Sequence, residues 1–117
     1  MEGMRPLALS SEMTLIHGEA ERHDVMLEFD WNEAKAVENY ARHGVSFELA
    51  TKVFNDLFAV ERIDDRRDYG EERFILIGIA EGHLLFVAYT EREERIRLIS
   101  ARRATKHEQD DYVRQNT

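Results

Sequence analysis

Two apolar stretches separated by only two residues constrain the fold more than any other part of this sequence. Residues 73–80 (RFILIGIA) and 83–90 (HLLFVAYT) are rich in β-forming side chains, and Glu81-Gly82 lies between them. This spacing is typical of a β-hairpin, because glycine permits the positive φ that a tight turn requires. Both stretches are apolar on both faces, so we expect these strands to occupy the centre of a sheet.

Shorter segments on either side predict the rest of the sheet. Residues 57–63 (LFAVERI) form a predicted strand before the hairpin, followed by a charged loop over 64–72 (DDRRDYGEE). After a turn over 91–94 (EREE), residues 95–100 (RIRLIS) return as an antiparallel strand. Residues 26–30 (MLEFD) alternate apolar and polar side chains, which predicts a short first strand.

The first two helices are predicted from their caps and their apolar periodicity. Residues 32–43 (NEAKAVENYARH) follow Asp30 and Asn32, either of which can cap a helix, and they end before a glycine. Ser46 caps a second predicted helix over 47–55. The faces expected to be buried are Ala34, Val37, Tyr40 and Ala41 on the first helix, and Phe47, Ala50, Val53 and Phe54 on the second. Two short helices across one glycine predict a compact helical hairpin.

A basic junction over 101–105 leads into a closing helix. Thr105, followed three residues later by Glu108, matches a capping box, and Tyr112 and Val113 are expected to pack on the domain. The predicted element order is therefore β-α-α-β-β-β-β-α. We predict an α+β fold, an antiparallel β-sheet meander with a two-helix N-terminal hairpin and a closing C-terminal helix.

The first 25 residues differ from the rest of the chain. They contain the only proline, Pro6, and show neither strand nor helix periodicity, so we expect 1–25 to be a poorly ordered extension before a domain over 26–117. Met26 is the first residue of the first predicted strand and is an alternative start. The chain has no cysteine, which excludes disulfides and thiolate chemistry. It shows no signal peptide and no apolar run near the roughly 20 residues that span a bilayer, so we expect a cytoplasmic protein without membrane contact.

Basic residues gather around the last predicted strand. Residues 92–106 hold six Lys or Arg and two Glu, in a chain whose formal net charge is −8. A local excess of cations in an acidic protein indicates a site for an anionic ligand. The acidic balance argues against nonspecific coating of nucleic acid, but not against a localised basic cleft.

Three separated segments resemble the BrnT family of toxins from bacterial type II toxin–antitoxin systems. They are FDWNEAKAVENYARHGVSFELATKVFND, GEERFILIGIAEGHLLFVAYTERE and RIRLISARRATKHEQDDY, and they run from about residue 27 to residue 112. Three motifs carry the resemblance: a tryptophan followed by a helix with Lys35, Asn39 and then His43-Gly44-Val45, the GEER start of a strand, and the RIxxISARxA junction.

The resemblance implies a small RelE-like ribonuclease fold and an mRNA-cleaving activity that needs no metal and no cofactor. It also implies neutralisation by a BrnA-type antitoxin, and a toxin–antitoxin complex that binds promoter DNA through the antitoxin. The final helix departs from the more basic surface of the family, because it carries Glu108, Asp110 and Asp111.

Metal-independent RNA cleavage determines what the site must contain. The ribose 2′-hydroxyl attacks the adjacent phosphorus, so a base takes its proton, cations stabilise the phosphorane and an acid protonates the leaving oxygen. Arginine suits the cationic task because its fork of donors matches phosphate oxygens. The predicted catalytic residues are Arg73, Tyr89, Arg97, Arg102 and His43, and the predicted RNA-binding residues are Lys35, Arg103 and Lys106.

These residues also have purely structural interpretations. A solvated cationic edge is the favoured interpretation for Arg92 and Arg95, which glutamates flank. Tyr89 either stacks on a base or is a half-buried strand tyrosine, and His43 either transfers protons or complements the helix dipole. Lys35 lies two turns before His43, so both can face one cleft. The identity of the general base stays open, and the sequence contains no metal-binding motif.

The sequence therefore predicts two alternative functions. The first is an endoribonuclease toxin that cleaves mRNA, inhibits translation and is neutralised by its antitoxin. The second is a non-catalytic or degenerate binding module, whose arginine surface docks an antitoxin or another acidic partner. The acidic final helix and the net charge of −8 are consistent with the second function.

Overall fold

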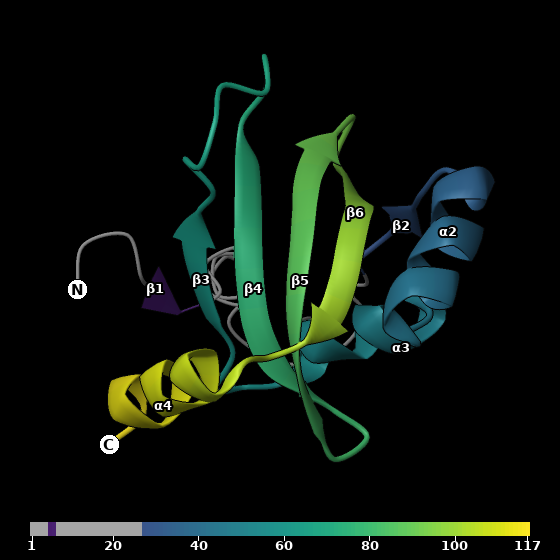
Figure 1. The fold of residues 1–117 in the computed structure, drawn as a ribbon. Coiled ribbons are helices and arrows are strands. Elements are labelled where there is room, and N and C mark those ends of the chain that lie inside the picture. Colours follow the sequence, from purple (N-terminus) through teal and green to yellow (C-terminus); the bar gives the residue numbers. More distant parts are fainter. Residues whose placement is uncertain (1–4, 7–26) are drawn as a thin grey trace, which may run out of the picture.

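A mixed β-sheet forms the frame of the molecule (Figure 1). The computed structural model describes residues 5–6 and 27–117, so the extension expected over 1–25 lies, apart from Arg5–Pro6, outside the described residues. The sheet has six strands in the order β1-β3-β4-β5-β6-β2. Their bounds are Arg5–Pro6 for β1, Phe29–Asp30 for β2, Val60–Ile63 for β3, Arg73–Ala80 for β4, His83–Arg92 for β5 and Arg95–Arg103 for β6.

The four strands β3 to β6 form the antiparallel meander that the sequence predicted. The hairpin of β4 and β5 turns at Glu81 and Gly82, both with positive φ, and a second two-residue turn at Glu93 and Glu94 joins β5 to β6. The short strand β2 departs from the expectation, because it pairs parallel to β6 and makes the sheet mixed. A two-residue strand carries no local signal for its direction, which only its tertiary pairing sets.

Strand β6 is longer than predicted. It continues to Arg103, where the sequence predicted a junction over 101–105. The register between β5 and β6 shifts beside Ala88 and Tyr89, and pairing then resumes along the rest of β5. The long β5 supplies hydrogen-bond partners that the local sequence of β6 does not reveal. The prediction of a junction was therefore wrong for its first three residues, and Arg102 lies on a strand.

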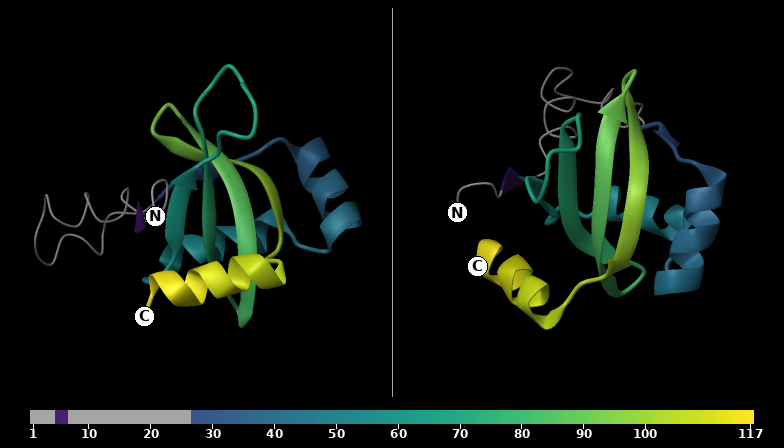
Figure 2. Two further views of the ribbon diagram at one scale, coloured as in Figure 1. Left: turned by 60° about the vertical axis from the view of Figure 1, so that its left-hand side comes forward. Right: turned by 45° about the horizontal axis from the view of Figure 1, so that its top comes forward.

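Helices cover both faces of the sheet, with α3 and α4 on opposite sides (Figure 2). The helical elements are α2 (Glu33–His43), α3 (Phe47–Thr51), the 3₁₀ helix η2 (Lys52–Asn55) and α4 (Lys106–Gln115). The residues predicted to be buried on the second helix are confirmed, because Phe47, Ala50, Val53 and Phe54 all belong to the main core. On the other face Tyr112 of α4 packs on the sheet, whereas Val113 is 57% exposed and does not. None of the described helices is long and apolar enough to cross a membrane.

The first helix, α2, differs from its prediction in two ways. The structure does not confirm a hairpin of two helices packed on each other, because α2 lies along β6 at the edge of the sheet. Its expected buried face is also wrong: Val37 is 67% exposed and Tyr40 is 59% exposed, and Ala34 and Ala41 are exposed as well. The buried residue of α2 is the polar Asn39, at 7% exposure.

Candidate functional site

One face of the sheet carries a group of arginines. Residues that pair directly across neighbouring antiparallel strands project from the same face. The register places three rows on this face: Val60–Ile77–Phe86–Arg102, Arg62–Ile75–Ala88–Ser100 and Arg73–Thr90–Arg97. Arg66, from the loop between β3 and β4, reaches the same face because its guanidinium group lies over Phe86. The arginine face is defined here as Arg62, Arg66, Arg73, Arg97 and Arg102.

The guanidinium groups of three of these arginines lie close to the ring of Phe86. The guanidinium carbons of Arg102, Arg66 and Arg62 lie 3.9, 5.7 and 5.9 Å from the centroid of its ring. These distances fall within the range of about 6 Å over which cation–π contacts form. The three arginines come from β6, from the β3–β4 loop and from β3, so only the folded sheet brings them together.

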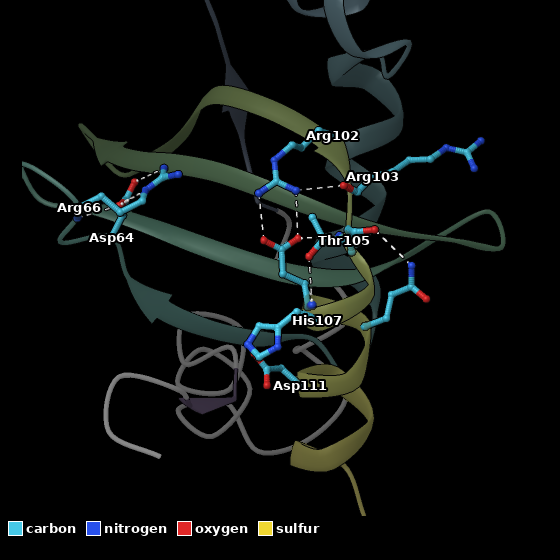
Figure 3. Close-up of polar contacts among 10 residues, drawn as sticks. Asp64, Arg66, Arg102, Arg103, Thr105, His107 and Asp111 are labelled. Atoms are coloured by element: carbon cyan, nitrogen blue, oxygen red, sulfur yellow. Dashed lines mark hydrogen bonds and ion pairs between the residues drawn. The ribbon is translucent and has the colours of Figure 1, made fainter.

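Carboxylates hold two of these three guanidinium groups. Arg102 donates to both carboxylate oxygens of Glu108, from Nη1 at 3.0 Å and from Nη2 at 2.9 Å (Figure 3). Arg66 donates to both oxygens of Asp64, from Nε and from Nη2, each at 2.7 Å. Arg62 forms no ion pair with any residue in the described part of the chain.

Two local structures place these carboxylates. Glu108 accepts a hydrogen bond from the backbone N–H of Thr105 at 2.9 Å, and the Thr105 hydroxyl accepts from the backbone N–H of Glu108 at 3.2 Å. The predicted capping box is therefore confirmed. Asp64 is buried, and it also accepts hydrogen bonds from the backbone N–H of Arg66 and the hydroxyl of Tyr69. It thus anchors the charged loop to the end of β3.

The ion pairs lower the pKa of both carboxyl groups. For Asp64, the side-chain hydrogen bond from Arg66 is the largest influence, and it outweighs the opposing effect of burial on the pKa. For Glu108, burial is the largest single influence and raises the pKa. The hydrogen bonds from Arg102 and from Thr105 together outweigh it, so the pKa of Glu108 lies below its ordinary value. Both groups are ionised at neutral pH and balance the charge of their arginines.

Arg73 and Arg97 lie in the third row, at the other end of the arginine face. Arg73 donates from Nε to Glu71 at 3.0 Å, and its guanidinium carbon lies 4.1 Å from the centroid of the Tyr69 ring. Arg97 donates from Nη1 to Asp30 at 3.3 Å. Four of the five residues of the arginine face therefore have a carboxylate partner, with which any bound phosphate must compete.

A pocket of about 190 Å³ opens where α2 meets β6. It is lined by Lys35, Glu38, Asn39, Arg42, His43, Ile99 and Ser100. Lys35 and His43 thus line one cavity, as their spacing on the helix predicted. Because Ser100 belongs to the middle row of the arginine face, the pocket lies beside that face. A carboxylate, an imidazole and two cations surround a single space next to the arginines.

Asn39 attaches α2 to the edge of the sheet. Its Nδ2 donates to the carbonyl oxygens of Val45 at 3.0 Å and of Ala101 at 2.9 Å, and its Oδ1 accepts from the N–H of Ala101 at 3.1 Å. The amide group therefore pairs with the backbone of β6 much as a neighbouring strand would. These bonds fix the rotation of α2, and with it the side chains that face the pocket.

The other predicted site residues lie away from this arrangement. Tyr89 is 0% exposed in the core on the opposite face of the sheet, and its hydroxyl donates to Glu61, so it has no surface for an RNA base. Arg103 is exposed and points away from Arg102 (Figure 3). Lys106 lies exposed at the start of α4 and donates to Asp110 at 3.1 Å.

Sequence reasoning did not identify Arg62, Arg66 or Phe86. A signal for Arg62 was present, because it lies two residues after Val60 and strand alternation puts both on one face. No local signal singles out Phe86 among the apolar residues of its strand. Asn39 was noticed only as part of a family motif, and its place on the helix did not indicate burial.

The fold and the site together define a class of protein, a small α+β domain with a cationic sheet face beside a polar pocket. Such an arrangement suits a ligand that carries phosphate groups. Comparison with protein families is more specific: the model of the ribonuclease toxin BrnT of type II toxin–antitoxin systems matches residues 31–108. This match covers more than half of the chain, which therefore belongs to the BrnT family of ribonuclease toxins. Membership implies an antitoxin protein as partner. A comparison with curated proteins found no match.

Proposed function

We propose that this chain is a metal-independent endoribonuclease that cleaves mRNA and thereby inhibits translation. The family supports ribonuclease activity in general. The observation that carries the proposal for this member is the pocket between α2 and β6, which opens beside the arginine face. Cleavage without a metal needs a proton-transfer group and cations around one phosphate, and this pocket brings His43 and Lys35 together.

In the proposed reaction the scissile phosphate lies where the pocket meets Ser100. His43 takes the proton of the ribose 2′-hydroxyl, because histidine is the side chain that readily changes charge near neutral pH. The 2′-oxygen bonds to phosphorus while the bond from phosphorus to the 5′-oxygen breaks. The leaving 5′-oxygen takes a proton from solvent, so the products are a cyclic phosphate and a free 5′-hydroxyl. Lys35 stabilises the crowded phosphorane. Glu38, on the same pocket wall, is the alternative base.

The arginine face binds the neighbouring phosphates in this proposal. Arg62 is the most available ligand, because no carboxylate in the described part of the chain competes for its donors. Arg73 and Arg97 form partly exposed ion pairs, which typically contribute only about 0–1 kcal/mol each, so a phosphate can displace their carboxylates. These contacts hold single-stranded RNA across the sheet, with the pocket at its edge.

A BrnA-type antitoxin completes the proposed system. It neutralises the toxin by binding it, and the complex binds promoter DNA through the antitoxin. The toxin acts in the cytoplasm, where its mRNA substrate is found. One observation favours a second candidate, a non-catalytic module that docks the antitoxin or another acidic partner: most arginines of the face are already paired with carboxylates.

Expression of the full chain from a tightly repressed promoter tests the ribonuclease proposal. We expect growth arrest together with cleaved mRNA, and we expect His43→Ala and Arg97→Ala each to relieve the arrest. Arg95→Ala is the matched control, because Arg95 lies on the same strand as Arg97 but is exposed and pairs with Glu28. Normal growth with intact mRNA at full expression would contradict the proposal.

Purified protein distinguishes the two candidate functions. A metal-independent ribonuclease cleaves a single-stranded RNA oligonucleotide in the presence of a chelator. A binding module forms a complex with its antitoxin and leaves the same oligonucleotide intact.

A further inference from the structure

Arg102 uses the edge of its guanidinium group within the protein. Its Nη1 donates to Glu108 at 3.0 Å and to the carbonyl oxygen of Arg103 at 3.1 Å, and its Nη2 donates to Glu108 at 2.9 Å (Figure 3). The ionised Glu108 carboxylate balances its charge. Both features weaken the role of phosphate ligand that the sequence predicted for Arg102.

The two faces of the same guanidinium group differ in their surroundings. One face covers the ring of Phe86, because the guanidinium carbon lies only 3.9 Å from the ring centroid. The side chain of Arg102 is nevertheless 30% exposed, and its other face is the part of the guanidinium group that neither the Phe86 ring nor the Glu108 carboxylate covers. Phe86 and Glu108 thus hold a flat group in one orientation, with one face free.

We propose that the free face of Arg102 stacks a base of the bound RNA, so that Phe86, Arg102 and the base form three layers. Unpaired RNA bases stack on aromatic rings and on guanidinium planes in many complexes. Arg62 binds the adjacent phosphate, because its guanidinium carbon lies 5.9 Å from the same ring and it forms no ion pair with the residues that the structure describes. This inference rests on the proposed RNA substrate and adds a base-binding subsite to it.

The position of Arg102 in the sheet determines where a stacked base lies relative to the pocket. Arg102 lies in the row next to that of Ser100, which lines the pocket. A base held at Arg102 therefore fixes the RNA beside the pocket, where the proposed cleavage takes place. Because every base has a flat face, the stack supplies affinity and positioning without a strong sequence preference.

Two substitutions separate stacking from phosphate binding. Arg102→Lys keeps the positive charge and removes the flat surface, whereas Arg102→Tyr keeps a flat surface and removes the charge. Stacking predicts that the tyrosine variant retains the interaction with the base and that the lysine variant loses it. Phosphate binding instead predicts that the lysine variant keeps the affinity for RNA and that the tyrosine variant loses it.

Binding of uncleavable RNA measures this difference. The probe is a single-stranded RNA oligonucleotide with 2′-O-methyl sugars, in which one nucleotide at a time is made abasic, and fluorescence anisotropy gives its affinity. At one position we expect loss of the base to weaken binding to the unaltered protein by about tenfold. The same loss should weaken binding to Arg102→Tyr similarly, and should have little effect on Arg102→Lys. Arg95→Lys, an exposed site on the same strand, should behave like the unaltered protein.

The outcomes of these measurements test both the base-stacking proposal and the ribonuclease proposal. The stacking proposal is overturned if no abasic position weakens binding. It is also overturned if an abasic nucleotide weakens binding to Arg102→Lys as much as binding to the unaltered protein. If the protein binds RNA but leaves the unmodified oligonucleotide intact, the ribonuclease proposal fails and the stack is still judged by the same comparison. If the protein binds no RNA, both fail. Thermal unfolding checks that each variant is folded; should Arg102→Lys unfold, Glu108→Gln replaces it and should reduce the abasic effect.

Discussion

At the scale of single residues, Asn39 provides the attachment that an apolar helix face was expected to provide. Its side-chain amide bonds to the backbone of Val45 and of Ala101, while Val37 and Tyr40 on the same helix are exposed. A buried amide of this kind is tolerated when all its groups are bonded, and removal of one partner leaves the others without compensation.

Replacement of Asn39 tests this attachment. We expect Asn39→Ala to lower the free energy of unfolding by about 2–4 kcal/mol, because it leaves buried backbone groups of Ala101 unpaired at a cost of about 1–3 kcal/mol each. Urea denaturation measures the change. Asn55→Ala is the matched control, since Asn55 is exposed and should change the value by less than about 0.5 kcal/mol. Equal effects of the two substitutions would argue against the attachment.

At the scale of elements, α2 turns its apolar side away from the sheet and its polar side toward β6. The helix therefore presents Lys35, Glu38 and His43 to the pocket, and the candidate site depends on this rotation. An apolar helix face packed on the core would have turned these side chains away from the pocket.

A pair of valine substitutions checks the rotation of α2. We expect Val37→Ala to change the free energy of unfolding by less than about 0.5 kcal/mol, because the side chain is already exposed. Val53→Ala, the matched change at a fully buried valine of η2, should cost about 2 kcal/mol through lost burial and the cavity it leaves. A comparable loss at both positions, measured by urea denaturation, would show that Val37 is buried after all.

At the scale of the whole molecule, ion pairs between loops, strands and helices link stability to pH. The pKa of Glu71 is lowered, chiefly by the hydrogen bond from Arg73. The pKa values of Asp64 and Glu108 are also lowered, by hydrogen bonds from their own arginines and from backbone N–H groups. A carboxyl group with a lowered pKa in the folded state stabilises the protein above its ordinary pKa, and this stabilisation is lost as the pH falls through the lowered value.

Denaturation at a series of pH values tests this linkage. We expect the free energy of unfolding to be nearly constant near neutral pH and to fall below about pH 5, where the unfolded chain begins to bind protons that the folded protein excludes. Glu108→Gln should make the decline shallower. Glu91→Gln, at an exposed glutamate without an ion pair in the described part of the chain, should leave the slope unchanged. If the free energy of unfolding declines as steeply with pH in Glu108→Gln as in the unaltered protein, Glu108 does not contribute to the pH dependence of stability.

The sequence by itself determined the features that depend on neighbouring residues. The hairpin of β4 and β5, the cap at Ser46 and the capping box at Thr105 are all present in the structure, because turns and caps are set within a few positions along the chain. The same holds for the family, whose motifs are short and local, and for the presence of arginines in β6.

Only the tertiary structure decided the direction in which the side chains point and the residues that they contact. The rotation of α2, the direction of β2 and the burial of Tyr89 all depend on partners far away in the sequence. The candidate site follows the same division: its arginines are visible in the sequence, but their meeting at Phe86 required the register of four strands. The physical reason is that neighbouring strands and helices supply the burial and the hydrogen-bond partners of a residue, and a single stretch of sequence does not contain them.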